Sequence, residues 1–277
     1  MATALAPANR ASFWRTLWTN AVFAPRTSLG FMRIDFVLGT VFIIPFTQML
    51  FFAFVAQLAS TTAAQAAAQI AYVAVGNAVA TVTYSSIFSV CQTTDHEKNN
   101  GTMEHLLVSP TNRFALYFGR GLVPILVSLA TVAVGLTYAI AVFGAPFSVG
   151  AIVPVTISVV LAAFSMVGFG LLLGGVALYL RTSIVLGNIF LFLGLLLSGT
   201  NFPASQLPVP LQIVGDGLPL TWATSAVRAS LSAAAPSVLY LDWAAVAIAG
   251  LVSYAMAIVL WRIFERRALA TGSIARF

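Results

Sequence analysis

The residues best equipped for chemistry lie together in one polar stretch of an otherwise apolar chain. His96 stands between Asp95 and Glu97, and His105 follows a short distance later. A histidine flanked by carboxylates can act in general acid–base catalysis, but the same residue types are typical of a solvated polar loop, which is the interpretation we favour. The spacing of the histidines and nearby carboxylates matches no zinc or other transition-metal site. We therefore predict no catalytic, cofactor-binding or metal-binding residue.

Nucleotide binding by a phosphate-cradling loop is also unexpected. Such a loop requires a glycine followed by lysine and then serine or threonine. The one lysine of the chain, Lys98, lies between Glu97 and Asn99. The chain should therefore hydrolyse no ATP by itself, and we expect no enzymatic activity. Because Cys91 is the one cysteine of the chain, an intrachain disulfide is excluded.

Composition places most of the chain in lipid. Of the 277 residues, 60% are hydrophobic and 7% are charged, and the mean hydropathy is +0.98. A soluble domain needs far more polar surface than this. The net charge of +6 comes from basic residues that are spread singly between apolar stretches, which argues against a nucleic-acid site. This composition argues against a soluble enzyme, a DNA-binding domain and a disordered scaffold.

Apolar stretches long enough to span a bilayer need about 20 residues, and the chain has six candidates. Alternating patterns typical of a β-barrel are missing from the sequence. We therefore predict an all-α membrane protein with a six-helix domain over residues 34–264. The expected spans are 34–59, 70–92, 114–143, 151–180, 183–200 and 241–264.

The positive charges predict the orientation of these spans. If both termini are cytoplasmic, every Lys and Arg except Arg228 lies on or near the cytoplasmic side, as the positive-inside rule requires. The preference for Arg over Lys, with many Ala and Val, points to a bacterial protein. We expect a multi-pass protein of the bacterial plasma (inner) membrane, with residues 265–277 as a cytoplasmic tail.

Two segments outside the spans have a helical pattern. Residues 1–33 carry Trp14 and Trp18 at helical spacing with arginines nearby, which predicts a cytoplasmic helix lying in the headgroup region. Between the second and third spans, Asn99 to Gly101 should break a helix, and Thr102 can cap a new one that carries Glu104 in its first turn. Pro110 ends this helix. Its apolar face consists of Met103, Leu106 and Leu107.

A helix as short as 102–109 is not stable alone, so it must rest on lipid or on a partner protein.

A second unusual segment, 201–240, alternates prolines with apolar pieces too short to cross the membrane. It should form an external re-entrant helical hairpin, covered by protein or lining a cavity. Its prolines are Pro203, Pro208, Pro210, Pro219 and Pro236.

Ionisable residues inside a membrane are costly and often functional. Asp35 opens the first span close to Arg33, and a local ion pair or interfacial anchor explains it, although a carboxylate that couples transport to protons is an alternative. Arg120 lies inside the third span and can extend its side chain to the cytoplasmic face.

The order of these parts resembles the ABC type 2 exporter permeases. In that family an acidic residue precedes a GT-x-E-x-L-L-x-S-P segment, and here Glu97 precedes a stretch that resembles it. The residues before the last span resemble the external pattern of the family, in which FP, LP and P-L-T are followed by an arginine. The first stretch is Gly101-Thr102-Met103-Glu104-His105-Leu106-Leu107-Val108-Ser109-Pro110, and the second comprises Phe202-Pro203, Leu207-Pro208, Leu218-Pro219-Leu220-Thr221 and Arg228.

The resemblance implies a homodimeric translocation path that works with two separate ATPase subunits, which would hold the ATP and Mg²⁺. It identifies the 102–109 helix as a coupling helix that docks on the ATPase, and it implies that the first and fifth spans and the external hairpin meet the second copy. The drug-exporting (daunorubicin-resistance-like) branch fits best and implies a drug-like or lipid cargo. Ser28-Leu29-Gly30 also resembles part of a motif of the polysaccharide exporters, so export of a lipid-linked polysaccharide is the alternative, and a proton-coupled carrier is the second.

Overall fold

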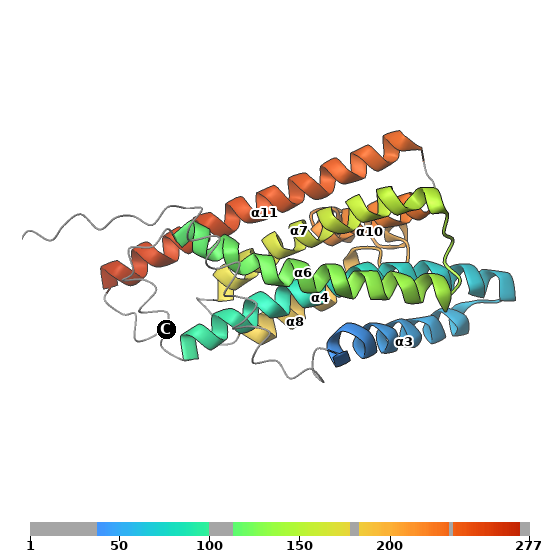
Figure 1. Ribbon diagram of the computed structural model, residues 1–277, viewed down its shortest axis with the longest axis horizontal. Helices are drawn as coiled ribbons and strands as arrows, with labels where there is room; N and C mark the ends of the chain where they lie inside the picture. The colour runs from blue at the N-terminus through green and yellow to red at the C-terminus, as the bar shows by residue number, and fades with distance from the viewer. Residues whose placement is uncertain (1–37, 100–112, 178–182, 233–234, 272–277) are drawn as a thin grey trace, which may run out of the picture.

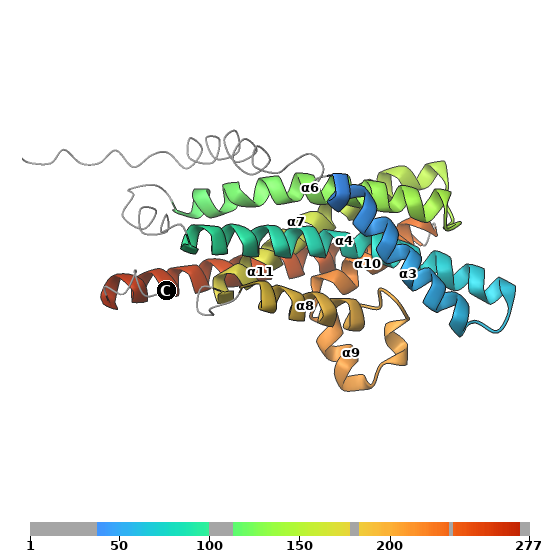
Figure 2. The same ribbon diagram turned by 90° about the horizontal axis from the view of Figure 1, so that it is seen from below.

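The structure is a computed structural model that describes residues 38–99, 113–177, 183–232 and 235–271. In these ranges every regular element is helical, and the helices form an elongated bundle (Figures 1 and 2). The all-α prediction is confirmed for this part of the chain. The expected helices at 1–33 and 102–109 lie outside the described residues.

Within the described ranges, helices occupy the positions of the six expected spans. They are α3 (Ile44–Ala59, after the π-helical turn η1, Gly39–Ile43), α4 (Ala63–Asn99), α6 (Arg113–Ala141), α7 (Ile152–Ala177, after the 3-10 turn η2, Val149–Ala151), α8 (Ser183–Leu197) and α11 (Pro236–Thr271). Two shorter helices lie between α8 and α11: α9 (Val209–Asp216, after the 3-10 turn η3, Ala204–Gln206) and α10 (Pro219–Leu231).

Prolines and short polar residues set several helix ends. Pro219 and Pro236 are the first residues of α10 and α11, where the missing N–H costs nothing. α3 ends where Ser60 turns extended. The hydroxyl of Thr62 then accepts a hydrogen bond from the Gln65 N–H at 3.3 Å, which caps the start of α4.

By length and composition, four apolar stretches are able to cross a membrane: Val41–Ala59, Ala63–Ile87, Val149–Val176 and Pro236–Ile263. The remaining two expected spans correspond to α6 and α8, whose apolar stretches are shorter, at Ile125–Ala141 and Val185–Leu197. Several long apolar helices in one chain make this a multi-pass membrane protein.

Two helices are longer than the sequence predicted. α4 runs from Ala63 to Asn99, because the alanine-rich residues before position 70 favour helix and because a helix can continue beyond the apolar region into water. The last residue of α4, Asn99, is the first residue of the predicted helix break (Asn99 to Gly101). α11 runs from Pro236 to Thr271, so the helix extends into the first residues of the predicted cytoplasmic tail (265–277).

Helix α4 lies at the centre of the bundle and packs against α3, α6, α7, α8 and α10. In the apolar window of α4, 61% of the residues are buried, whereas the corresponding fractions are 22% in α3 and 28% in α11. α3 and α11 therefore turn broad apolar surfaces outward, as helices in contact with lipid do. α10 lies against α4, α7 and α11, whereas α9 projects from the bundle and exposes Val209, Ile213 and Val214 (Figure 2).

Candidate functional site

The most unusual polar group in the described residues is Arg228, near the end of α10. Its guanidinium carbon lies 3.5 Å from the centre of the Tyr72 ring of α4, a cation–π contact. Nη1 donates to the carbonyl oxygen of Gly199 at 2.9 Å, and Nη2 donates to those of Tyr72 and Thr200 at 3.0 and 2.8 Å. Charge counting treated Arg228 as an external cation, but its side chain is inserted between α10, α4 and the turn after α8.

The charge of Arg228 is balanced by dipoles. Each hydrogen-bond partner that it has among the described residues is a backbone carbonyl oxygen, and its Nε is buried without a partner there. Burial lowers the pKa of Arg228 to about 10, so the group remains protonated at neutral pH. A buried cation held in this way ties its own helix firmly to the segments that supply the carbonyls.

Gly76 makes the close approach of Arg228 to α4 possible. A methyl group at this position would overlap the Thr200 carbonyl oxygen and would lie 2.5 Å from Arg228 Nη2. Gly199 is required for a different reason: its φ of +71° is in the left-handed region, which other residues adopt at a cost. In this conformation its carbonyl oxygen accepts from both the Tyr72 hydroxyl and Arg228.

An amide network extends this site to α3. Asn77 Nδ2 donates to Asn201 Oδ1 at 2.8 Å, and Gln48 Nε2 donates to Asn77 Oδ1 at 3.1 Å. Asn77 is fully buried, so each of these bonds stabilises a group that would be costly to leave alone. We refer to the joined residues as the Arg228 cluster: Gln48, Tyr72, Gly76, Asn77, Gly199, Thr200, Asn201 and Arg228.

A second set of polar contacts attaches α10 to α7 and α11. Trp243 Nε1 donates to the Ser158 hydroxyl at 2.7 Å, and that hydroxyl lies 3.0 Å from the Ser230 hydroxyl. Nearby, the Ser225 hydroxyl donates to the buried carboxylate of Asp242 at 2.8 Å. α10 is thus held on three sides by side-chain hydrogen bonds, to α4, α7 and α11.

The structure places the predicted hairpin residues around this arrangement. Phe202 and Pro203 come just before η3, Pro208 is the residue before α9, and Pro219 begins α10. Pro219 is buried, whereas Pro208 is exposed. Arg228 alone of these five belongs to the cluster. The signal that sequence reasoning passed over was Asn77, an amide inside an apolar span.

Other predicted site residues are less fully described. Glu97 lies in the last turns of α4, and Arg120 lies on the helical backbone of α6. Asp35 and the predicted coupling residues lie outside the described residues: Gly101, Thr102, Met103, Glu104, Leu106, Leu107 and Pro110. Across the described ranges, no group of three or more His, Cys, Asp or Glu is arranged to hold a metal ion.

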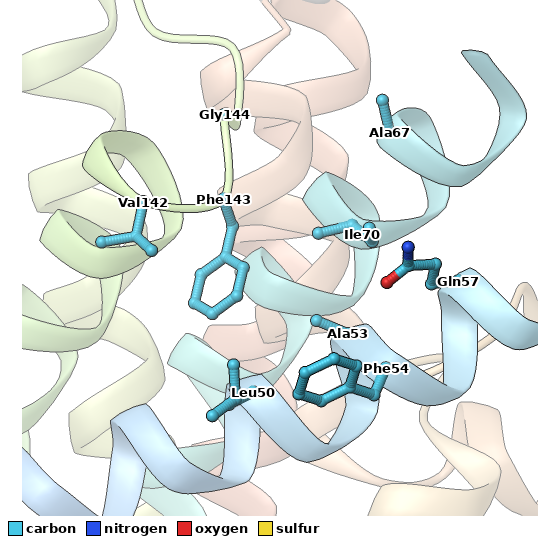
Figure 3. A pocket seen from close by; sticks show the side chains of 9 residues that line it. All are labelled: Leu50, Ala53, Phe54, Gln57, Ala67, Ile70, Val142, Phe143 and Gly144. Carbon is cyan, nitrogen blue, oxygen red and sulfur yellow. The ribbon is translucent and has the colours of Figure 1, made fainter. Parts of the chain in front are cut away.

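A largely apolar pocket of about 430 Å³ lies between α3, the start of α4 and the turn after α6 (Figure 3). In Figure 3 the Phe143 ring points from this turn toward Leu50, and the Gln57 amide lies at the other side of the pocket. Gln57 is the one polar side chain in the lining. The lining residues, all in the described part of the chain, are Leu50, Ala53, Phe54, Gln57, Ala67, Ile70, Val142, Phe143 and Gly144.

Comparison with known proteins decides what this bundle belongs to. A family model described as ABC-2 type transporter matches residues 21–232, most of the chain. The chain belongs to the ABC-2 type transporter family. The ABC-2 match includes the Arg228 cluster and the segment that contains the expected coupling helix, and the family resemblance inferred from the sequence is confirmed.

Two curated relatives of this ABC-2 chain carry the name "Probable multidrug ABC transporter permease YbhR", from Escherichia coli strain K12 and from Escherichia coli O157:H7. Each is 28% identical over 116 residues, which is 42% of this chain and 31% of the relative. The match thus spans about a third of the length of these curated relatives.

Proposed function

We propose that this chain is the transmembrane subunit of an ATP-driven exporter in the bacterial plasma membrane. Two copies form the translocation path, two separate ATPase subunits bind on the cytoplasmic side, and a hydrophobic or amphiphilic small molecule moves outward. The observation that carries the proposal is the ABC-2 family match over residues 21–232. The sequence contains no phosphate-binding loop, which supports the proposal that a partner subunit binds the nucleotide.

In the proposed topology all six long helices cross the bilayer and both termini are cytoplasmic. The end of α4 at Asn99, the start of α6 at Arg113 and the end of α11 gather at one end of the bundle (Figures 1 and 2). Of the basic residues in the described ranges, all but Arg228 lie toward this end, which supports its placement in the cytoplasm. They are Lys98, Arg113, Arg120, Arg262, Arg266 and Arg267. α9 and α10 have 8 and 13 residues and are shorter than each of these six helices, of which α8 with 15 residues is the shortest. They form a re-entrant hairpin from the outside.

Coupling to the ATPase would act through residues 102–109. This segment joins the end of α4 to the start of α6, so a push on it moves both helices. α4 also contacts α10 through the Arg228 cluster. Movement of the ATPase dimer would therefore be passed along α4 to the external hairpin as a rigid-body shift.

The proposed cargo class is supported by the pocket between α3, α4 and α6. Its volume of about 430 Å³ falls within the range of about 300–1,000 Å³ found for small-molecule sites. Its apolar walls with one amide suit an amphiphile better than a large sugar chain. The word "multidrug" in the names of the two relatives favours the same class.

Association with the ATPase is the direct test. Leu106→Asp places a carboxylate on the apolar face of the proposed coupling helix, and it should abolish co-purification with the cognate ABC ATPase. Leu211→Asp makes the same change at an exposed leucine of α9, and it should leave co-purification unchanged. Equal retention of the ATPase by both variants would refute the assignment of residues 102–109.

A further inference from the structure

A small cavity lies where α10 begins, at the junction of four helices. It leaves about 10 Å³ for the centre of a water molecule, which is enough for one water and no more. The walls come from α4, α7, α8 and the first residues of α10. They are Thr83, Met166, Phe169, Phe190, Gly194, Leu218, Pro219 and Leu220.

Thr83 contributes the one hydroxyl group in these walls, all of which are described. Its side chain is 2% exposed, and its Oγ1 has no hydrogen-bond partner among the described residues. Threonines in helices commonly donate to the carbonyl four residues earlier, as Thr131 and Thr224 do here. Thr83 does not, so its hydroxyl is available to a group inside the cavity.

The beginning of α10, with Leu218, Pro219 and Leu220, forms another wall of the cavity. Leu218 precedes the helix and, within the described part of the chain, gives it no side-chain cap. Pro219 has no N–H, so Leu220 is the first residue that can offer one. The first N–H groups of a helix have no acceptor inside the helix, and this end carries the positive pole of the helix dipole. An oxygen atom is therefore favoured at this position.

We propose that the cavity holds one structural water, which exchanges hydrogen bonds with Thr83 Oγ1 and accepts from the first-turn N–H of α10 at Leu220. The size of the cavity excludes a phosphate or carboxylate. The water attaches the beginning of α10 to α4, while Arg228 attaches its end to α4 through Tyr72. The re-entrant helix is then fastened to α4 at both ends. This site stands independently of the proposed function.

Ser165 provides a matched comparison. Its Oγ is also buried without a partner in the described residues, but it is packed against Gly250, where an added methyl group would lie 2.9 Å from it. On this side the hydroxyl meets the α11 backbone directly. Ser165 and Thr83 thus each have a buried hydroxyl without a partner in the described residues. The Ser165 hydroxyl packs against Gly250, and the Thr83 hydroxyl lies beside the cavity.

The test is to determine structures at a resolution that shows ordered water, and to measure melting temperatures of the full chain in detergent. We expect a density peak within hydrogen-bond distance of Thr83 Oγ1 in the wild type and in Thr83→Ser. Thr83→Val should remove the peak and lower the apparent melting temperature by about 2–4 °C, because the water loses a partner.

Ser165→Ala should melt at or above the wild-type temperature, because it removes an unpaired hydroxyl from its contact with the α11 backbone. An empty cavity in the wild type, with Thr83→Val as stable as the wild type or more so, would overturn the proposal. If Thr83→Val does not fold, the presence or absence of the peak in the wild type and in Thr83→Ser decides the question.

Discussion

Gly76 offers the sharpest test of how α10 is held on α4. Replacing it with alanine adds one methyl group, which would overlap the Thr200 carbonyl oxygen and crowd Arg228 Nη2. Both Nη2 bonds of Arg228, to Tyr72 and Thr200, would have to lengthen. We expect the hairpin to be displaced from α4 and the protein to be destabilised, although alanine is the better helix former.

The magnitude follows from three contributions. Overpacking costs about 1–3 kcal/mol, and two interhelical hydrogen bonds in a membrane protein contribute about 0.6–1.7 kcal/mol each. The gain in helix propensity offsets about 1 kcal/mol. Gly76→Ala should therefore lower the free energy of unfolding by about 1–5 kcal/mol.

The assay is unfolding in mixed micelles, followed by the fluorescence of the five tryptophans. Gly39→Ala is the matched control, because a methyl group there meets no atom of the described residues within 4 Å, and it should be neutral or stabilising. In a double-mutant cycle with Arg228→Met, the combined cost should be smaller than the sum of the single costs, because both changes disrupt the same contacts. A Gly76→Ala variant that is as stable as Gly39→Ala would refute this account of the cluster.

Two further variants probe the same region by the same unfolding measurement. Asn77→Leu removes the bonds to Asn201 and Gln48 and should cost about 1–3 kcal/mol; unchanged stability would mean that the amide network contributes nothing. Gly199→Ala forces a side chain into the left-handed region at φ +71° and should cost about 1–2 kcal/mol, whereas Gly199→Asn, which tolerates that region better, should cost less. Equal effects of the two substitutions would show that backbone conformation is not what selects glycine there.

The positions of the helices were predictable from the sequence because long apolar runs leave few alternatives in lipid. The prolines likewise predicted the short helices α9 and α10. Helix ends were less predictable. The polarity that marks the end of a membrane span does not end the helix, so α4 continues beyond the expected span (70–92) to Asn99, the first residue of the predicted helix break, and α11 continues to Thr271.

The Arg228 cluster was not predictable in the same way. Its acceptors are backbone carbonyls on α4 and on the turn after α8, far from Arg228 in sequence, and backbone groups leave no trace in residue types. Positive-inside counting assigned Arg228 to the outer side as a topology signal. The sequence did contain one clue, the Gly76–Asn77 pair, in which a residue without a side chain precedes a polar amide inside an apolar span.

The central claim is that this chain transports only when a separate ATPase drives it. The most direct measurement is ATP hydrolysis in proteoliposomes that contain this chain, its cognate ABC ATPase, or both. The account predicts no hydrolysis by this chain alone, and a change in the ATPase rate when both are present that Leu106→Asp abolishes. An ATPase rate that is the same with and without this chain would contradict it.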